Sequence, residues 1–570
     1  MRQGRTLRTV LLATSALVPF GLVPAHSNPQ GGQVVGGSAS ISTQGSTTTI
    51  TQSTDRAVIN WNTFNINAGE TTRFIQPNSG SVALNRVTGG LGPSTIYGTL
   101  TANGQVWIIN PAGILIGNGA VVNTSGFLAT TSDIKNSDFM AGRYNFTIPG
   151  RADASVVNLG TITAANGGFA ALVAPGVRNS GTITAKFGNI SLASGNTFSL
   201  DFYGDSLITL GVGDSIAGQV KDIATGQTLD ALVKNEGLLK ANGGKVELTA
   251  VSARQVVDSV INNKGVIEAR SIGHRNGMIV LGAQTSKTKV AGAPVQTVKV
   301  SGTLNVSGKK KGGTVKVTGE AIELASANIN ASGGTGGGTV MIGGDTGGGN
   351  LNSITGSIPQ AALSSSPVPT ADTVSVDKNS TIDVSATQAG DGGKAIVWSD
   401  TKTVFAGTVL AKGGAQSGNG GFVEVSGKQM LAYGGVVNTS AVNGSYGTLL
   451  LDPYNITISS DPTSGVDQQT YQATAENSVM NVTDLVNALS NSNVWLWTGT
   501  AYSPGNQPGN ITVNAAVTWN SATTLTLSAA NNVAINAAIT APNGGLTVFA
   551  ADRKSTRLNS SHTDISRMPS

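Results

Sequence analysis

The sequence predicts an all-β fold, a right-handed parallel β-helix (a solenoid) with an N-terminal β cap. Three observations predict it. Only 11% of the residues are charged and 76 of 570 are Gly, whereas ordinary globular domains carry about 25% charged residues. Short apolar segments alternate with Gly, Asn and Ser breaks, which indicates strands joined by tight turns. Similar segments recur every 20–30 residues, a period typical of solenoids.

The chain begins with a predicted secretory signal peptide, residues 1–27. A basic start precedes an apolar run over residues 10–23, and the small residues Ala25 and Ser27 follow it. The run is too short to span a bilayer comfortably, since a membrane helix needs about 20 residues. We therefore expect cleavage near Ser27 and export of the remaining chain.

The stretch over residues 103–119, NGQVWIINPAGILIGNG, predicts strand, turn, strand. Residues 106–109 and 114–116 are apolar at consecutive positions, which favours strands buried on both faces. Residues 110–113 predict the turn, because Pro fixes φ and Gly tolerates positive φ.

This stretch resembles the Asn-Pro-Asn-Gly-Ile signature of two-partner secretion domains, as in filamentous haemagglutinins. Asn110, Pro111, Gly113 and Ile114 match the signature, whereas Ala112 stands where Asn is usual. The resemblance continues upstream through NPQG (28–31), DRAVINWNTFN (55–65) and SVALNRVTGG (81–90), and it covers roughly residues 28–270 well.

The resemblance implies a partner, an outer-membrane β-barrel transporter with POTRA domains. It also implies that Asn110, Pro111, Gly113 and Ile114 take part in recognition by that partner. The residues themselves support another interpretation, a tight coil corner held by an internal Asn hydrogen bond. The two interpretations are compatible.

Two repeats follow the turn. The first, NLGTITA, starts at Asn158 and recurs as NSGTITA at Asn179, 21 residues later; looser copies start at Asn235 and Asn263, 28 residues apart. The second is Gly-Gly followed by an alternating apolar strand. Its last five copies start at Gly243, Gly312, Gly337, Gly392 and Gly420.

The steps between these copies are 69, 25, 55 and 28 residues. We interpret 25 and 28 as single coils, and 69 and 55 as two or three coils with insertions. Such coils bury their apolar side chains only by stacking. At ~22 residues and ~4.8 Å per coil, residues 28–450 would form about 19 coils and a rod on the order of 90 Å.

The later chain divides by composition. We expect a β-helix repeat region over residues 271–451, with a Pro- and Ser-rich insertion near 351–373, and a further, incomplete β-rich segment over 452–551. Thr483 predicts a helix N-cap, with Leu485, Val486 and Leu489 on one face. Residues 552–570 match a translated sequencing adapter and are excluded from the fold prediction.

Charge and cysteine content exclude several function classes. Removing the +3 of residues 1–27 and the +2 of residues 552–570 from the formal charge of +5 leaves residues 28–551 neutral. We therefore expect no nucleic-acid partner. The chain has no Cys, so it has no disulfide or thiolate chemistry, and His274 is the one His between residues 28 and 551. We expect no cofactor and no metal.

The carboxylates do not predict a catalytic site. Asp345, Asp383, Asp391, Asp400 and Glu424 fall near strand ends or Gly turns, where we expect solvated side chains.

Two short clusters of polar residues are also interpreted mainly as solvated turn residues, and each has a second interpretation. Asp201 and Asp205, beside Tyr203, are either exposed turn residues or a small polar site. Lys309 to Lys311 form either a solvated turn or a contact for a glycan or polyanion.

By resemblance, the protein is a secreted, cell-surface filamentous adhesin of a Gram-negative bacterium, and not an enzyme. Its ligand would lie on host cells, surfaces or other bacteria, and a glycan is one candidate. A stalk for a C-terminal contact-dependent toxin and a polysaccharide-degrading β-helix enzyme are the alternatives.

Overall fold

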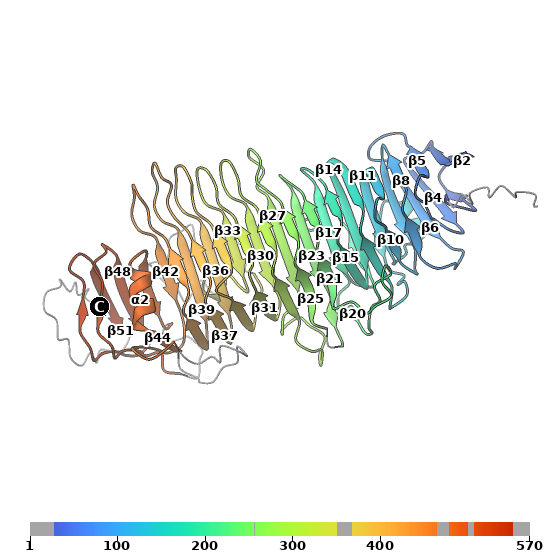
Figure 1. The fold of residues 1–570 in the computed structure, drawn as a ribbon. Helices are drawn as coiled ribbons and strands as arrows, with labels where there is room; N and C mark the ends of the chain where they lie inside the picture. Colours follow the sequence, from blue (N-terminus) through green and yellow to red (C-terminus); the bar gives the residue numbers. More distant parts are fainter. Residues whose placement is uncertain (1–27, 256, 350–367, 464–477, 500–506, 551–570) are drawn as a thin grey trace, which may run out of the picture.

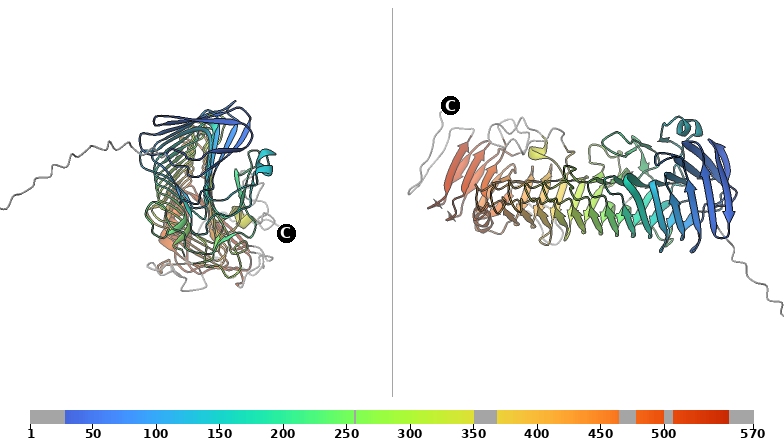
Figure 2. Two further views of the ribbon diagram at one scale, coloured as in Figure 1. Left: turned by 90° about the vertical axis from the view of Figure 1, so that its right-hand side faces the viewer. Right: turned by 90° about the horizontal axis from the view of Figure 1, so that it is seen from above.

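The computed structural model describes residues 28–255, 257–349, 368–463, 478–499 and 507–550, which form one rod of stacked strands (Figure 1). Viewed towards its end, the rod shows its coils superposed (Figure 2). The expected signal peptide, residues 552–570 and most of the Pro-rich insertion lie outside the described residues. Within the described ranges, none of the helices has the length and apolar character needed to cross a membrane.

Each coil contributes strands to parallel ladders, which makes the fold a right-handed parallel β-helix, as predicted. The first ladder runs the length of the rod with parallel pairing at every step. Its strands are β4 (Arg56–Trp61), β6 (Val82–Val87), β9 (Gln105–Ile109), β11 (Val121–Thr130), β14 (Thr161–Ala174), β17 (Asn189–Ser194), β23 (Lys245–Ala250), β27 (Met278–Ala283), β30 (Thr314–Thr318), β33 (Thr339–Ile342), β36 (Lys394–Ser399), β39 (Phe422–Gly427), β42 (Thr448–Leu451), β45 (Asn493–Trp497), β48 (Thr524–Ala529) and β51 (Gly545–Ala550).

A second ladder belongs to the same sheet, because the long strands β11 and β14 take part in both. Its other strands are β5 (Thr71–Ile75), β8 (Thr99–Ala102), β16 (Thr182–Thr184), β22 (Leu238–Lys240), β26 (Val266–Glu268), β29 (Thr303–Asn305), β32 (Asn328–Asn330), β35 (Thr381–Asp383), β38 (Thr408–Leu410) and β41 (Val436–Asn438).

A separate parallel sheet closes the coils over most of the rod, and a four-stranded sheet takes its place near the C-terminal end. Its strands are β7 (Ser94–Ile96), β10 (Ile114–Ile116), β13 (Ser155–Asn158), β15 (Gly176–Asn179), β21 (Ala231–Asn235), β25 (Ser259–Asn263), β28 (Thr297–Val300), β31 (Ala321–Leu324), β34 (Thr373–Val376), β37 (Lys402–Phe405) and β40 (Met430–Tyr433).

Antiparallel strands close the N-terminal end, which confirms the predicted β cap. β1 (Gln33–Gly36) pairs antiparallel with β4, and β2 (Ala39–Gln44) pairs antiparallel with β3 (Thr47–Gln52). β3 then pairs parallel with β5, where the coil stack begins.

The predicted number of coils was too high. The first ladder has thirteen strands from β4 to β42, not 19 coils, so this part of the rod measures ~58 Å at about 4.8 Å per step. Val340 of β33 pairs directly with Ala395 of β36, so the 55-residue step is a single coil with an insertion. The 69-residue step holds two coils, because β27 lies between β23 and β30. Insertions that leave the rod lengthen the coils without adding height.

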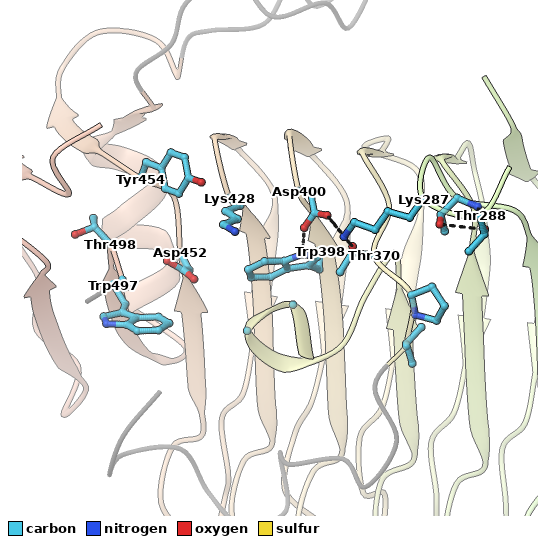
Figure 3. Close-up of a pocket in the computed structure, with 16 residues that line it drawn as sticks. Lys287, Thr288, Thr370, Trp398, Asp400, Lys428, Asp452, Tyr454, Trp497 and Thr498 are labelled. Atoms are coloured by element: carbon cyan, nitrogen blue, oxygen red, sulfur yellow. Dashed lines mark hydrogen bonds and ion pairs between the residues drawn. The ribbon is translucent and has the colours of Figure 1, made fainter. Parts of the chain in front are cut away.

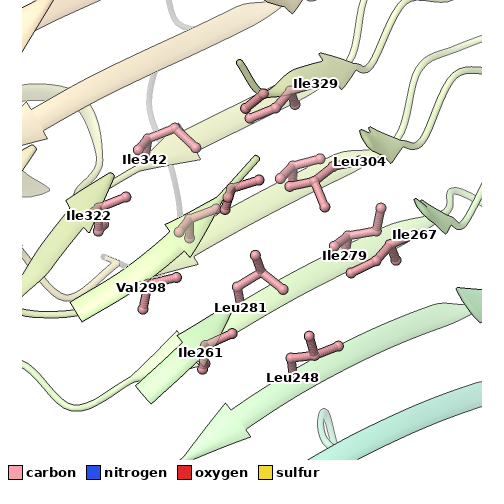
Figure 4. Packing of buried hydrophobic residues seen from close by; sticks show 14 of the residues in the cluster. Leu248, Ile261, Ile267, Ile279, Leu281, Val298, Leu304, Ile322, Ile329 and Ile342 are labelled. Carbon is pink, nitrogen blue, oxygen red and sulfur yellow. The ribbon is translucent and has the colours of Figure 1, made fainter. Parts of the chain in front are cut away.

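The core consists of inward-facing apolar residues stacked from coil to coil. Leu248 pairs with Leu281, and Ile261 pairs with Val298 (Figure 4). A buried asparagine ladder runs beside this stack, because the first repeat places one Asn per coil. Asn158 donates to Asn179 (2.7 Å), Asn179 to Asn235 (2.8 Å) and Asn235 to Asn263 (2.8 Å) through side-chain amides.

The helix predicted near residue 483 exists, but its N-cap was assigned wrongly. α2 (Val482–Leu489) is capped by Asn481, whose side-chain oxygen accepts from the Thr483 backbone N–H at 2.8 Å. Leu485 and Leu489 are buried, as expected.

Candidate functional site

The Asn110 turn connects two faces of one coil near the N-terminal cap. It joins β9 of the first ladder to β10 of the closing sheet, so the predicted strand, turn, strand is confirmed. The Gly113 N–H donates to the Asn110 carbonyl at 3.0 Å, which closes the turn. β10 itself lies between β7 and β13 in parallel register. The turn therefore belongs to the coil stack and is no free loop.

The Asn110 side chain is 2% exposed and makes three hydrogen bonds. Its oxygen accepts from the Ala112 N–H at 2.9 Å, which is the internal bond expected from the sequence. Its amide nitrogen donates to the Gly92 carbonyl at 3.1 Å and to the Ser94 hydroxyl at 3.0 Å. Asn110 thus holds the turn and ties it to the preceding coil.

Gly113 has a φ of +112°, a conformation that L side chains rarely adopt. A Cβ at this position would also lie 2.8 Å from the Ser155 carbonyl oxygen and 2.8 Å from the Ile223 Cδ1. Both conformation and space therefore require Gly.

Most of the predicted recognition residues are buried in the folded protein. Asn110, Gly113 and Ile114 are buried, and Pro111 is the exposed one of the four. The Pro111 carbonyl accepts from the Arg151 N–H at 2.9 Å, so a later segment covers the turn. A partner that recognises these residues therefore has to bind them before this coil folds.

Two carboxylates expected to be solvated are instead buried. Glu424 is 0% and Asp345 2% exposed, because their strands and loop face an apolar cluster on the outside of the first ladder. Asp345 is paired with Lys394 at 3.0 Å. Burial raises the pKa of Glu424 to about 8, while the Gly347 N–H and the Ser426 hydroxyl, which donate to it, act in the opposite direction.

Asp201 and Asp205 are exposed, as one of the two interpretations of the sequence predicted. Asp201 accepts from the Tyr203 and Gly204 N–H groups in an exposed turn. In the part of the chain that the structure describes, no three His, Asp or Glu side chains are placed to hold a metal ion.

An N-terminal β cap, a coil stack and an early Asn-Pro corner with a buried Asn are the features of a β-helical secretion domain. The TPS secretion domain family matches residues 25–295. Among solved structures, the HMW1 secretion domain from Haemophilus influenzae superposes with a TM-score of 0.56 and 31% identity, over 73% of this chain and 99% of that one. The chain belongs to the two-partner secretion family of exoproteins, which includes the filamentous haemagglutinins.

Two curated relatives are heme/hemopexin-binding proteins of Haemophilus influenzae. One, from strain ATCC 51907 / DSM 11121 / KW20 / Rd, is 35% identical over 265 residues, which is 45% of this chain and 28% of the relative. The other is 30% identical over 308 residues, 50% of this chain and 31% of the relative. The chain thus spans about three tenths of the length of these relatives.

Proposed function

We propose that this protein is exported by a two-partner secretion system and acts as a surface adhesin. Its N-terminal domain directs transport through an outer-membrane β-barrel transporter with POTRA domains. The rod then presents its outer faces at the cell surface or in the medium. It works by binding and not by catalysis.

The observation that carries the export proposal is the burial of the Asn110 turn. A transporter that exports an unfolded chain can recognise residues that are buried once the chain has folded. Asn110, Gly113 and Ile114 are such residues. The absence of Cys supports it as well, since no disulfide can lock the fold in the oxidising periplasm.

The turn also supports a folding role during export. Each coil buries its apolar residues only against a neighbour, so folding of a solenoid spreads from a formed coil to the next. A corner that fixes β9 against β10, next to the cap, is suited to start that process outside the cell. The same residues would then be recognised by the transporter first and would start folding of the rod afterwards.

The test is secretion of residues 1–300 from cells that co-express the partner transporter. We expect the fragment in the medium only when the transporter is present. A fragment that reaches the medium equally well without the transporter, or that stays in the periplasm with it, contradicts the proposal.

A further inference from the structure

A cleft of about 420 Å³ lies on the outer face of the first ladder, near the C-terminal end of the rod (Figure 3). Its floor is a row of outward positions on successive coils, which the strand register brings into line. The row consists of Trp398, Ser426, Asp452 and Trp497, of which Ser426 is fully buried and does not line the cleft. Three steps of ~4.8 Å place the two Trp side chains about 14 Å apart.

The floor is apolar where outer faces of rods are usually polar. Trp398 and Trp497 join a buried cluster with Phe422 and Leu450. Gly347 and Val368, from the two described ends of the segment between β33 and β34, line the same cleft. These two ends therefore form part of its wall.

Two charged groups between the Trp side chains have no partner. Among the described residues, neither the Asp452 carboxylate nor the Lys428 ammonium makes a hydrogen bond or an ion pair (Figure 3). Asp452 is only partly exposed. Its burial and the nearby Glu424 carboxyl raise the pKa of Asp452 well above its usual range, and Lys428 opposes this shift.

The other charged pair in the cleft is already satisfied. Asp400 accepts from the Thr370 hydroxyl at 2.7 Å, from the Lys287 ammonium at 3.2 Å and from the Trp398 indole N–H at 3.3 Å. This arrangement fixes one wall of the cleft. The Lys428 ammonium remains as a donor, and the Asp452 carboxyl as an acceptor, for a ligand in the cleft.

An acid and a base that make no side-chain hydrogen bond in an apolar cleft cost stability, because desolvated polar groups without hydrogen bonds are unfavourable. A concave site whose polar groups lower the stability of the folded state is typical of a ligand-binding site.

The chemistry of the walls selects a neutral ligand rich in hydroxyl groups. The Lys287 ammonium and the Asp400 carboxylate offset each other, and the raised pKa of Asp452 favours its neutral form, so no unbalanced carboxylate in the cleft favours a cation. A hydroxyl group both donates and accepts, and so it satisfies Lys428 and Asp452 together. The volume lies within the range of small-molecule sites, ~300–1,000 Å³, which combine apolar walls with few polar groups.

We propose that this cleft binds a neutral carbohydrate, one hexose unit of a larger glycan, between Trp398 and Trp497. This rests on the proposed adhesin function and names the ligand class of one of its sites. The sugar is bound and released unchanged, because Glu424 is fully buried and Asp400, the other carboxylate in the cleft, is already bonded to Thr370 and Lys287.

The experiment uses the chain without residues 1–27, purified from the cytoplasm, so that failure of export cannot affect it. Tryptophan fluorescence and calorimetry follow titration with glucose, galactose, mannose and their disaccharides. Sialic acid and choline serve as charged comparators. We expect one neutral sugar to bind, and to be recovered uncleaved.

Asp452→Asn and Lys428→Met should each weaken this binding at least ten-fold, with an unchanged or raised Tm. Lys412→Met, an exposed lysine outside the cleft, is the matched control and should bind like the parent. The proposal is overturned if no neutral sugar binds, if sialic acid or choline binds more tightly, if the sugar is cleaved, or if the cleft variants bind normally. Normal export of a chain that fails these tests would leave the proposed transport function intact.

Discussion

At the scale of single residues, burial decides the chemistry of the charged groups. The Glu424 carboxyl stays protonated up to about pH 8, because its side chain is buried away from solvent. Unfolding exposes it, and its pKa returns to about 4.5. Between these two values the folded state binds one proton more than the unfolded state. Its contribution to stability therefore falls as pH rises from about 4.5 to 8, by up to about 1.4 kcal/mol per pH unit.

Glu424→Gln removes this titration and keeps an oxygen to accept from the Gly347 N–H. We expect the variant to gain Tm over the parent at pH 8 and to approach it at pH 5. Thermal melting of both proteins across this range measures the difference. A constant difference between parent and variant across the range is the contradictory outcome.

At the scale of elements, the asparagine ladder holds successive coils in register. Asn179 is fully buried and bonded on both sides, so Asn179→Ala leaves a donor on Asn158 and an acceptor on Asn235 without partners. We expect a loss of about 2–4 kcal/mol. Hydrogen exchange of the β13, β15 and β21 amides measures it locally, because a solenoid need not unfold as one unit.

Asn536→Ala is the matched control, since the bond from Asn536 to Asn514 (2.8 Å) is exposed. Its cost should stay within about 0.5 kcal/mol. Equal protection loss in the two variants would refute the role of burial in the ladder.

The sequence was sufficient for the elements whose signal is local or repeated. The Asn-Pro turn, the asparagine repeats and the cap follow from residue patterns that the structure keeps.

The cleft could not be predicted, because Trp398, Lys428 and Asp452 lie on neighbouring coils and the insertion lengths set which strands become neighbours. For the same reason the coil number was overestimated, and Glu424 was placed in solvent. The Thr483 cap was misplaced by two residues, since Asn and Thr both cap helices and only the backbone decides between them.

At the scale of the whole molecule, stacking of the coils stabilises the rod, and we expect it to fold without a metal ion. We expect circular dichroism and Tm to stay unchanged in EDTA, since the described acidic side chains form no metal-binding group. Loss of structure on chelation, restored by Ca²⁺, would contradict this expectation.

The central claim is that the Asn110 turn has a role in export that other coil corners lack. Asn438 and Gly418 offer a matched late pair: Asn438 accepts from the Ser440 N–H at 2.9 Å, as Asn110 does from Ala112, and Gly418 has a φ of +115° against +112° at Gly113. A Cβ at Gly418 would lie 2.0 Å from the Gly390 carbonyl oxygen, against 2.8 Å from the Ser155 carbonyl oxygen at Gly113, so Gly418→Val is at least as damaging to local packing as Gly113→Val.

The most direct test compares secretion of two full-length double variants in cells that co-express the transporter. We predict that Asn110→Ala with Gly113→Val abolishes secretion into the medium. Asn438→Ala with Gly418→Val should be secreted at close to the parent level. Equal secretion of the two variants would show that the early turn is a coil corner like any other.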